Sequence, residues 1–243
     1  MDLANFKSFS CRLHFMNRFF IWSVIVLVCE PLLSYSANAS GERNILFSID
    51  AVDQRGFRGR KLSNDSEIWL YSDINWSGVS AGINYSSEDA HDAYISYSYA
   101  TELFYYSAGL KYVGHFEISD TEIFVEFAGR EDYFGFTPSI YVAQETGGNR
   151  SYVEAGFSRD IVRRDWLINP HAAVAFGDYY SEDFDANHFE FGLDVTKKLS
   201  SISESVYFSA ALNAIKPLSA VEEISGDDDV YVQASIGLVF MFD

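Results

Sequence analysis

The 243-residue sequence has little cysteine, little proline and few basic residues. Its two cysteines, Cys11 and Cys29, lie near the N-terminus, so no disulfide framework holds the rest of the chain. Four prolines exclude proline-rich linkers and collagen-like repeats. The 17 Lys and Arg stand against 35 Asp and Glu, a net charge of −18. Because such a chain repels phosphates, we expect no nucleic-acid partner.

Hydrophobic and aromatic residues are plentiful. They make up 48% and 17% of the chain, which excludes an acidic disordered protein.

The N-terminal segment has the three parts of a secretory signal peptide. Lys7, Arg12 and Arg18 give it a positive start, an apolar run covers 19–29, and Ala37-Asn38-Ala39 forms a small-x-small cleavage site. The alternative is an uncleaved membrane anchor, but the run is shorter than the ~18–20 residues that a spanning helix needs. We therefore predict an exported protein.

Cleavage would divide the chain into a signal peptide, 1–39, and one domain, 40–243. It would remove three basic and two acidic residues, leaving 14 Lys and Arg against 33 Asp and Glu and a net charge of −19. It would also remove both cysteines.

Strict alternation of apolar and polar residues runs through the predicted mature chain. The last thirteen residues show it most clearly, because seven apolar side chains fall on every second position: Val230, Val232, Ala234, Ile236, Leu238, Phe240 and Phe242. Successive side chains of a strand point to opposite faces, so this period predicts strands with one apolar and one polar face.

The pattern predicts about twelve strands with no helix between them. They cover residues 44–52, 66–75, 78–86, 91–99, 103–113, 121–129, 134–144, 151–159, 166–177, 187–197, 204–214 and 230–242. An even number of antiparallel strands of about ten residues is typical of a transmembrane β-barrel. A soluble periplasmic or secreted barrel is the alternative.

Three features favour the membrane. Charged residues share the polar face with Ser and Gly in mid-strand. Connections alternate between short turns at 75–78 and 100–102, as on a periplasmic side, and longer, mostly acidic segments at 53–65, 114–120, 178–187 and 215–229, as on an outer side. Trp76 and Trp166 fall at expected short-turn ends, where an aromatic girdle would lie.

No residue pattern predicts catalysis, a metal or a cofactor. The histidines of 40–243 are His91, His115, His171 and His188, and none has the spacing of a metal ligand pair or of a His-x-Ser hydrolase motif. His171, which shares a face with Asn169, is the best candidate for pairing with a distant serine. A lumen histidine in a hydrogen-bond network is the favoured interpretation.

Carboxylates on the polar face are the candidate pore lining, because acids around a wet lumen favour cations. The residues predicted for this role are Glu67, Asp73, Glu126, Glu154, Glu190 and Asp194. The alternative is a structural role, in which inward acids, Asp50 and Glu122 among them, pair with Lys111 and other bases inside a plugged barrel.

One basic cluster stands out in this acidic chain: Arg55, Arg58, Arg60 and Lys61, in the first expected outer loop. Folded inward, the loop would face the acidic wall and form a constriction. Kept outside, it would contact lipopolysaccharide phosphates, or it would be an ordinary solvated loop.

The region around this loop resembles the TorF-type porins, proteobacterial outer-membrane proteins of similar length. Phe57-Arg58-Gly59, Ser63 and Ser77-Gly78 match the family's N-terminal pattern in order, and 152–156 is a further match. Ser66 stands near the position where the family usually has a proline. The resemblance implies an outer-membrane barrel and a passive pore, and it brings no catalytic residues.

Together these observations predict a barrel in the outer membrane of a Gram-negative bacterium, in contact with outer-membrane lipid and lipopolysaccharide. We expect a narrow passive pore for small neutral or cationic solutes. Inward aromatic residues would narrow it: Trp69, Tyr71, Tyr94, Tyr105, Tyr141, Tyr207 and Tyr231. The alternatives are an outer-membrane enzyme acting on lipid or lipopolysaccharide and a non-conducting surface or adhesion barrel.

Overall fold

The computed structural model describes residues 43–63, 65–88, 90–115, 118–129, 135–148, 150–180, 183–225 and 229–242. The predicted signal peptide lies outside these residues. No helix in the described part is long and apolar enough to cross a membrane.

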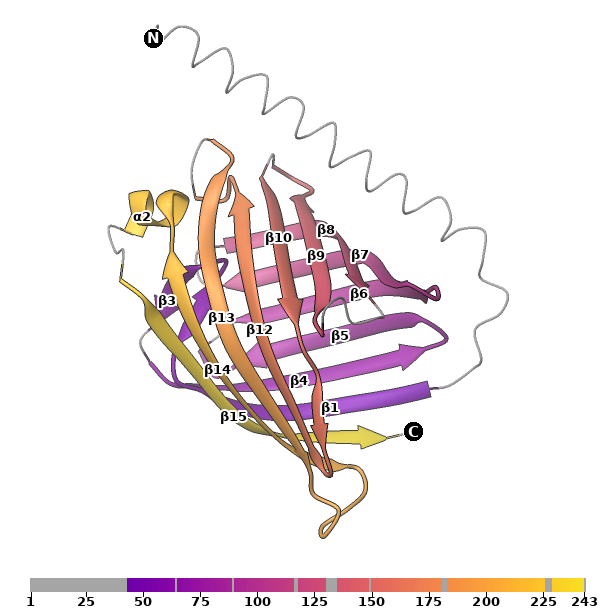
Figure 1. Cartoon of the computed structure of the whole chain (residues 1–243). Helices are drawn as coiled ribbons and strands as arrows, with labels where there is room; N and C mark the ends of the chain where they lie inside the picture. The colour runs from indigo at the N-terminus through magenta and orange to yellow at the C-terminus, as the bar shows by residue number, and fades with distance from the viewer. Residues whose placement is uncertain are drawn as a thin grey trace, which may run out of the picture.

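Twelve long strands form a closed antiparallel barrel, as predicted (Figure 1). In order around the wall they are β1 (Arg43–Val52), β4 (Glu67–Trp76), β5 (Val79–Ser86), β6 (His91–Ala100), β7 (Phe104–His115), β8 (Ile118–Gly129), β9 (Thr137–Glu145), β10 (Ser151–Ser158), β12 (Trp166–Gly177), β13 (Asp185–Lys198), β14 (Val206–Pro217) and β15 (Tyr231–Phe242).

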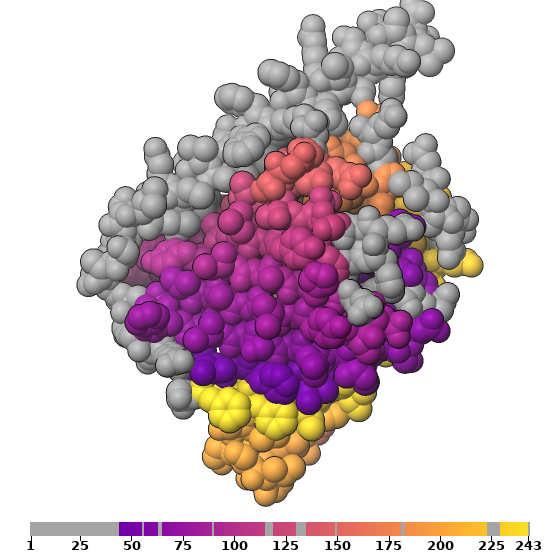
Figure 2. Space-filling model, turned by 180° about the vertical axis from the view of Figure 1, so that it is seen from behind, coloured from indigo at the N-terminus to yellow at the C-terminus, as the bar shows by residue number. Residues whose placement is uncertain are grey.

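The first and last strands of the barrel pair with each other and close the wall. β1 pairs with β15 from Ile45↔Phe242 to Val52↔Ser235, and the side chains of the two strands adjoin along this seam in Figure 2. A short strand, β11 (Ile161–Arg163), pairs with β12 beyond the end of β10 and continues its line. The described strands therefore form a wall that closes on itself, which is what a sheet in lipid requires.

The apolar face of the strands points outward. Large hydrophobic side chains in the middle of the wall are exposed, among them Ile83 (64%), Phe191 (57%) and Ile236 (55%). A soluble barrel would bury this face in its interior, so the outward apolar surface identifies a transmembrane barrel and excludes the soluble alternative.

Tight turns gather at the end of the barrel where β1 begins and β15 ends (Figure 1). Ser77 and Gly78 have positive φ of 52° and 85° and join β4 to β5 in two residues, as a hairpin turn of the primed type does. Trp76 pairs with Arg43, and Trp166 pairs with Lys197, whose ammonium lies 4.8 Å from the indole ring. Both tryptophans are therefore at short-turn ends, as predicted.

Two predictions about the connections were wrong. Residues 114–120 are mostly strand rather than an outer loop, because β7 continues to His115 and β8 begins at Ile118. Segment 215–229 is not all loop: β14 reaches Pro217, and a short helix, α2 (Ser219–Ser225), follows and packs on β13 (Figure 1). Seven residues are too few to give a readable helical period in the sequence.

A small apolar core fills the half of the lumen away from the end where β1 begins and β15 ends. It combines wall residues with Tyr179 and Tyr180 from the segment after β12 and Val221 from α2, all buried. The wall contributes Phe124, Ala143, Tyr152 and Ala175. A barrel of twelve strands is thus packed with side chains at one end.

The outward apolar face predicts how charge substitutions act on stability. Ile83→Lys places an ammonium in the middle of the lipid-facing wall and should cost about 2–4 kcal/mol of unfolding free energy. Val162→Lys, on the exposed β11 beside the tight turn, should cost only about 0–1 kcal/mol. Urea unfolding in lipid vesicles measures both, and equal costs would contradict the assigned orientation.

Candidate functional site

A two-stranded hairpin folds from the rim into the lumen. It consists of β2 (Arg55–Phe57) and β3 (Arg60–Ser63), which pair with each other between β1 and β4. We call residues 55–63 the arginine hairpin. Arg58 and Gly59 form its turn with positive φ of 49° and 86°, as in type I′ turns.

The hairpin tip reaches the opposite wall. A Cβ on Gly59 would lie 2.6 Å from Cβ of His188 on β13, so only glycine fits this contact. Gly56, at the start of the hairpin, is in direct contact with the Tyr231 ring of β15. The absence of a side chain at these two positions lets the hairpin lie against the wall on both sides.

Arg58 anchors the tip in a buried ion pair. Its Nη2 lies 2.6 Å from both carboxylate oxygens of Glu122 on β8, and the two side chains are only 6% and 1% exposed. The Tyr179 hydroxyl donates a 2.5 Å hydrogen bond to Glu122 Oε1. The strand period predicts that Glu122 faces inward, but no pattern in the sequence indicates this partner, which is 64 residues away.

Aromatic rings enclose the Arg58 guanidinium. Its central carbon lies 4.0 Å from the Tyr152 ring centroid and 4.1 Å from that of Tyr179. Burial is the largest single influence and lowers the pKa of Arg58, but attraction to the Glu122 carboxylate and to three tyrosine side chains together outweighs it, so the pKa is raised. The guanidinium is therefore charged at every physiological pH, and cation–π contacts stabilise it where water is excluded.

Further contacts hold the rest of the tip. The Tyr180 hydroxyl donates a 2.7 Å hydrogen bond to the carbonyl oxygen of Phe57. The Phe57 ring meets Tyr179 edge to face at 6.4 Å. The hairpin is thus fixed by an ion pair, a main-chain hydrogen bond and packed aromatic rings.

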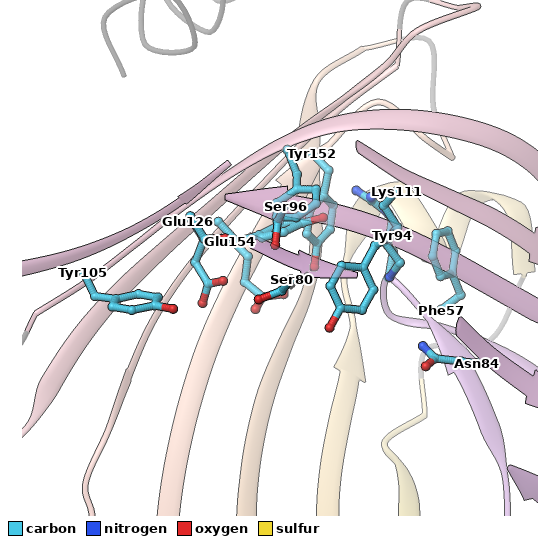
Figure 3. A pocket seen from close by; sticks show the side chains of 14 residues that line it. Phe57, Ser80, Asn84, Tyr94, Ser96, Tyr105, Lys111, Glu126, Tyr152 and Glu154 are labelled. Carbon is cyan, nitrogen blue, oxygen red and sulfur yellow. Dashed lines mark hydrogen bonds between the residues drawn. The ribbon is translucent and has the colours of Figure 1, made fainter. Parts of the chain in front are cut away.

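A cavity of about 560 Å³ lies beside the hairpin tip, inside the barrel (Figure 3). Phe57 and Arg58 form its boundary on the hairpin side, and six consecutive wall strands, β5 to β10, supply the rest. The wall residues are Ser80, Asn84, Tyr94, Ser96, Tyr105, Ser107, Lys111, Phe124, Glu126, Tyr141, Tyr152 and Glu154. Polar groups and aromatic rings therefore alternate around this space.

Two of the predicted pore-lining acids meet in the cavity. Glu126 and Glu154 both pair with Tyr141 in the sheet register, so they lie at one level on either side of it (Figure 3). The Tyr152 hydroxyl donates a 2.5 Å hydrogen bond to Glu154 Oε2. This level of the wall is the most acidic part of the cavity.

The other predicted acids lie elsewhere on the inner wall. Glu67 is buried at the rim end of β4, and Asp73 accepts a 2.6 Å hydrogen bond from the Tyr94 hydroxyl. Glu190 and Asp194 are on β13 and flank His171. The structure brings the six acids to one lumen but not to one cluster.

The basic cluster is divided by the hairpin. Arg58 points to Glu122, whereas Lys61 lies 6.0 Å from the Tyr231 ring centroid. Arg60 is the first residue of β3 and pairs with Phe57. Arg55 starts β2, and its side chain lies outside the described residues.

His171 has carboxylates at both ring nitrogens. Nε2 lies 3.3 Å from Glu190 and Nδ1 lies 3.4 Å from Asp194. Ser158 is its register partner on β10, but among the described residues no hydrogen bond joins the Ser158 hydroxyl to His171. Asn169 donates to Asp160 instead. In the described part of the chain no three side chains are grouped as a metal site requires.

No family model matches the chain, and no curated protein sequence matches it. The resemblance to the TorF-type porins therefore stays a prediction. Solved structures do match.

One is the structure of a KdgM porin in complex with disordered oligogalacturonate, whose sequence is 8% identical to this one. The match covers 82% of this chain and 99% of the porin chain, with a TM-score of 0.52. A bacterial polysaccharide outer membrane secretin is 12% identical, with 85% and 100% covered and a TM-score of 0.48. An outer membrane channel from Pseudomonas putida F1 is 11% identical, with 86% and 98% covered and a TM-score of 0.46. The porin match shows a shared barrel fold.

The buried ion pair predicts that Glu122→Gln releases the arginine hairpin. The change leaves a charged guanidinium without its carboxylate inside the lumen, which costs about 3–5 kcal/mol unless the hairpin moves out. Limited trypsin digestion followed by mass spectrometry should then show cleavage after Arg58, which is protected in the unmodified protein.

The matched control is Glu88→Gln, which removes the same charge from an exposed connection. Protection of Arg58 in both variants would contradict the anchoring role of Glu122.

Proposed function

We propose that the protein is a narrow passive pore in the outer membrane of a Gram-negative bacterium, selective for small neutral and cationic solutes. The observation that carries the proposal is the cavity of about 560 Å³ inside a closed barrel, with acidic residues on its wall. A barrel that served only as a surface anchor would have no need of a polar, hollow interior.

The charges of the lumen support cation preference. Glu126 and Glu154 lie in the cavity, and Glu190 and Asp194 lie on another part of the inner wall. The strongest base in the lumen, Arg58, is neutralised by Glu122. Low-dielectric walls focus the remaining field, which is negative and concentrates cations.

The width of the barrel supports a small size limit. Eight strands give a filled interior and 16–18 give an open channel, so twelve strands lie between these cases. The arginine hairpin and the apolar core occupy the end opposite the one where β1 begins and β15 ends. Solutes would pass beside the hairpin, which narrows the lumen and so forms the constriction of the proposed pore.

The outer-membrane location rests on the exposed apolar wall, the tryptophans at the short-turn end and the fold shared with a solved porin. The resemblance to the TorF-type porins agrees with this location. Lipid and lipopolysaccharide would then surround the barrel. The carboxylates at both nitrogens of His171 lend no support to a lipid hydrolase.

Single-channel recording in a planar bilayer tests the proposal. With a salt gradient across the membrane, the refolded protein should give reproducible current steps and a cation-selective reversal potential. Removing both cavity acids, Glu126→Gln with Glu154→Gln, should move the reversal potential toward zero, because the charged wall sets the selectivity. Glu88→Gln is the control and should leave it in place.

Silence from a protein shown to be folded would contradict the pore and favour a surface or adhesion barrel. Anion selectivity would contradict the role of the acidic wall.

A further inference from the structure

The cavity has charges of opposite sign at its two ends. Lys111 pairs with Glu122 in the register of β7 and β8, and Ser107 pairs with Glu126. Lys111 and Glu126 are therefore four positions apart along neighbouring strands, about 13 Å at ~3.3 Å per residue. Figure 3 shows Lys111 on the side of Phe57, with Glu126 and Glu154 together on the other side.

The side chains at these ends have unused hydrogen-bonding capacity. No hydrogen bond or ion pair joins Lys111 or Glu126 to another residue that the structure describes. Glu122, the neighbour of Lys111, already binds Arg58 and Tyr179. Nη1 of Arg58 is buried and has no acceptor among the described residues. A buried donor without an acceptor is costly, so Arg58 Nη1 is placed for a ligand, and the half-buried Lys111 and Glu126 can reach the same ligand from the wall.

Aromatic rings cover the wall between the charged ends. Phe124 and Tyr141 stack with centroids 5.8 Å apart, and Tyr94 and Tyr105 line the cavity from β6 and β7. Uncharged polar groups lie among them, from Ser80, Asn84, Ser96 and Ser107. Such a wall suits a peptide-like solute, which has polar amide groups and apolar side chains.

We propose that this cavity is a binding site for short zwitterionic peptides of dipeptide size. The solute carboxylate lies at Lys111 and Arg58 Nη1, and its ammonium lies between Glu126 and Glu154. Passage of such a solute through the barrel rests on the proposed pore function, but binding in the cavity does not.

The length of the solute follows from the spacing of the charges. Side chains of a strand stand roughly perpendicular to the sheet, so the ~13 Å between the backbone positions of Lys111 and Glu126 also separates the levels of their charged groups. Hydrogen bonds of ~3 Å at each end then leave about 7 Å between the charged groups of the ligand. Two extended residues cover about 7 Å at ~3.3–3.6 Å each. A free amino acid is too short to reach both ends. The volume of about 560 Å³ lies in the range of small-ligand sites.

Equilibrium dialysis of labelled Ala-Ala against the refolded barrel in detergent tests the site without any current. Ala-Ala should bind at least tenfold more tightly than alanine, than N-acetyl-Ala-Ala, which lacks the ammonium, and than Ala-Ala amide, which lacks the carboxylate. Equal binding of the four compounds, or no binding, would overturn the proposal.

Two variants test which side chain binds the carboxylate of Ala-Ala and which binds its ammonium. Lys111→Met should weaken Ala-Ala binding at least tenfold and leave Ala-Ala amide unchanged, whereas Glu126→Gln should weaken both. Lys197→Met, at the rim beside Trp166, and Glu88→Gln are the matched controls and should change neither. Equal effects of Lys111→Met and Lys197→Met would overturn the assignment of the carboxylate end.

Bilayer recordings with the same compounds separate the two proposals. Binding without any conductance would leave the site standing and contradict the pore. Conductance without Ala-Ala binding would contradict the site alone.

Discussion

The ion pair between Arg58 and Glu122 is the contact on which the arrangement of the lumen depends. Removing two charges from water is costly, and the cost is repaid here by short hydrogen bonds, the Tyr179 hydroxyl and two aromatic rings over the guanidinium. Each of these groups comes from a different part of the chain. The pair therefore ties the hairpin, β8, β10 and the segment after β12 into one unit.

The closed barrel explains why this unit lies inside. β1 and β4 are neighbours in the wall, so the hairpin between them must either extend outward or fold into the lumen. The lumen offers a carboxylate and aromatic faces, whereas outside the basic residues would only be solvated. Folding inward divides the interior into a packed half, next to α2, and a hollow half with acidic walls.

The proposed passage of solutes depends on the fixed charges along the wall of the hollow half. Glu126 and Glu154 lie at one level of its wall, and His188 Nε2 lies 4.0 Å from Glu154 Oε2. The opposed charges of Lys111 and the two glutamates favour solutes that carry both signs. Selectivity for such solutes would follow from the positions of fixed charges along the wall and would require no moving part.

The wall of the barrel could be predicted from the sequence because successive side chains of a strand point to opposite faces, so the lipid-facing residues recur at every second position. Val232, Ile236 and Phe240 alternate with smaller residues whatever their partners are. Segment 114–120 was misassigned because glycine and charged residues there resemble a loop, although the strands continue through it.

The interior could be predicted only in part. The inward direction of Glu126 and Glu154 follows from the period, and so does their place on the polar face. The pairing of Arg58 with Glu122 does not, because it depends on how far a hairpin reaches across a barrel whose register is unknown from one sequence. The contacts of Tyr179 and Tyr180 could not be predicted for the same reason. Both residues lie in a connection, where no alternation of side chains indicates which way they point.

A double-mutant cycle on the Arg58–Glu122 pair tests the account most directly. The free energies of unfolding in lipid vesicles are measured for the unmodified protein, Arg58→Gln, Glu122→Gln and the double variant. We expect a coupling energy of at least about 1.5 kcal/mol between Arg58 and Glu122, within the range for residues of one buried network. Costs that add to within about 0.3–0.5 kcal/mol would show that the two side chains do not interact, and would contradict it.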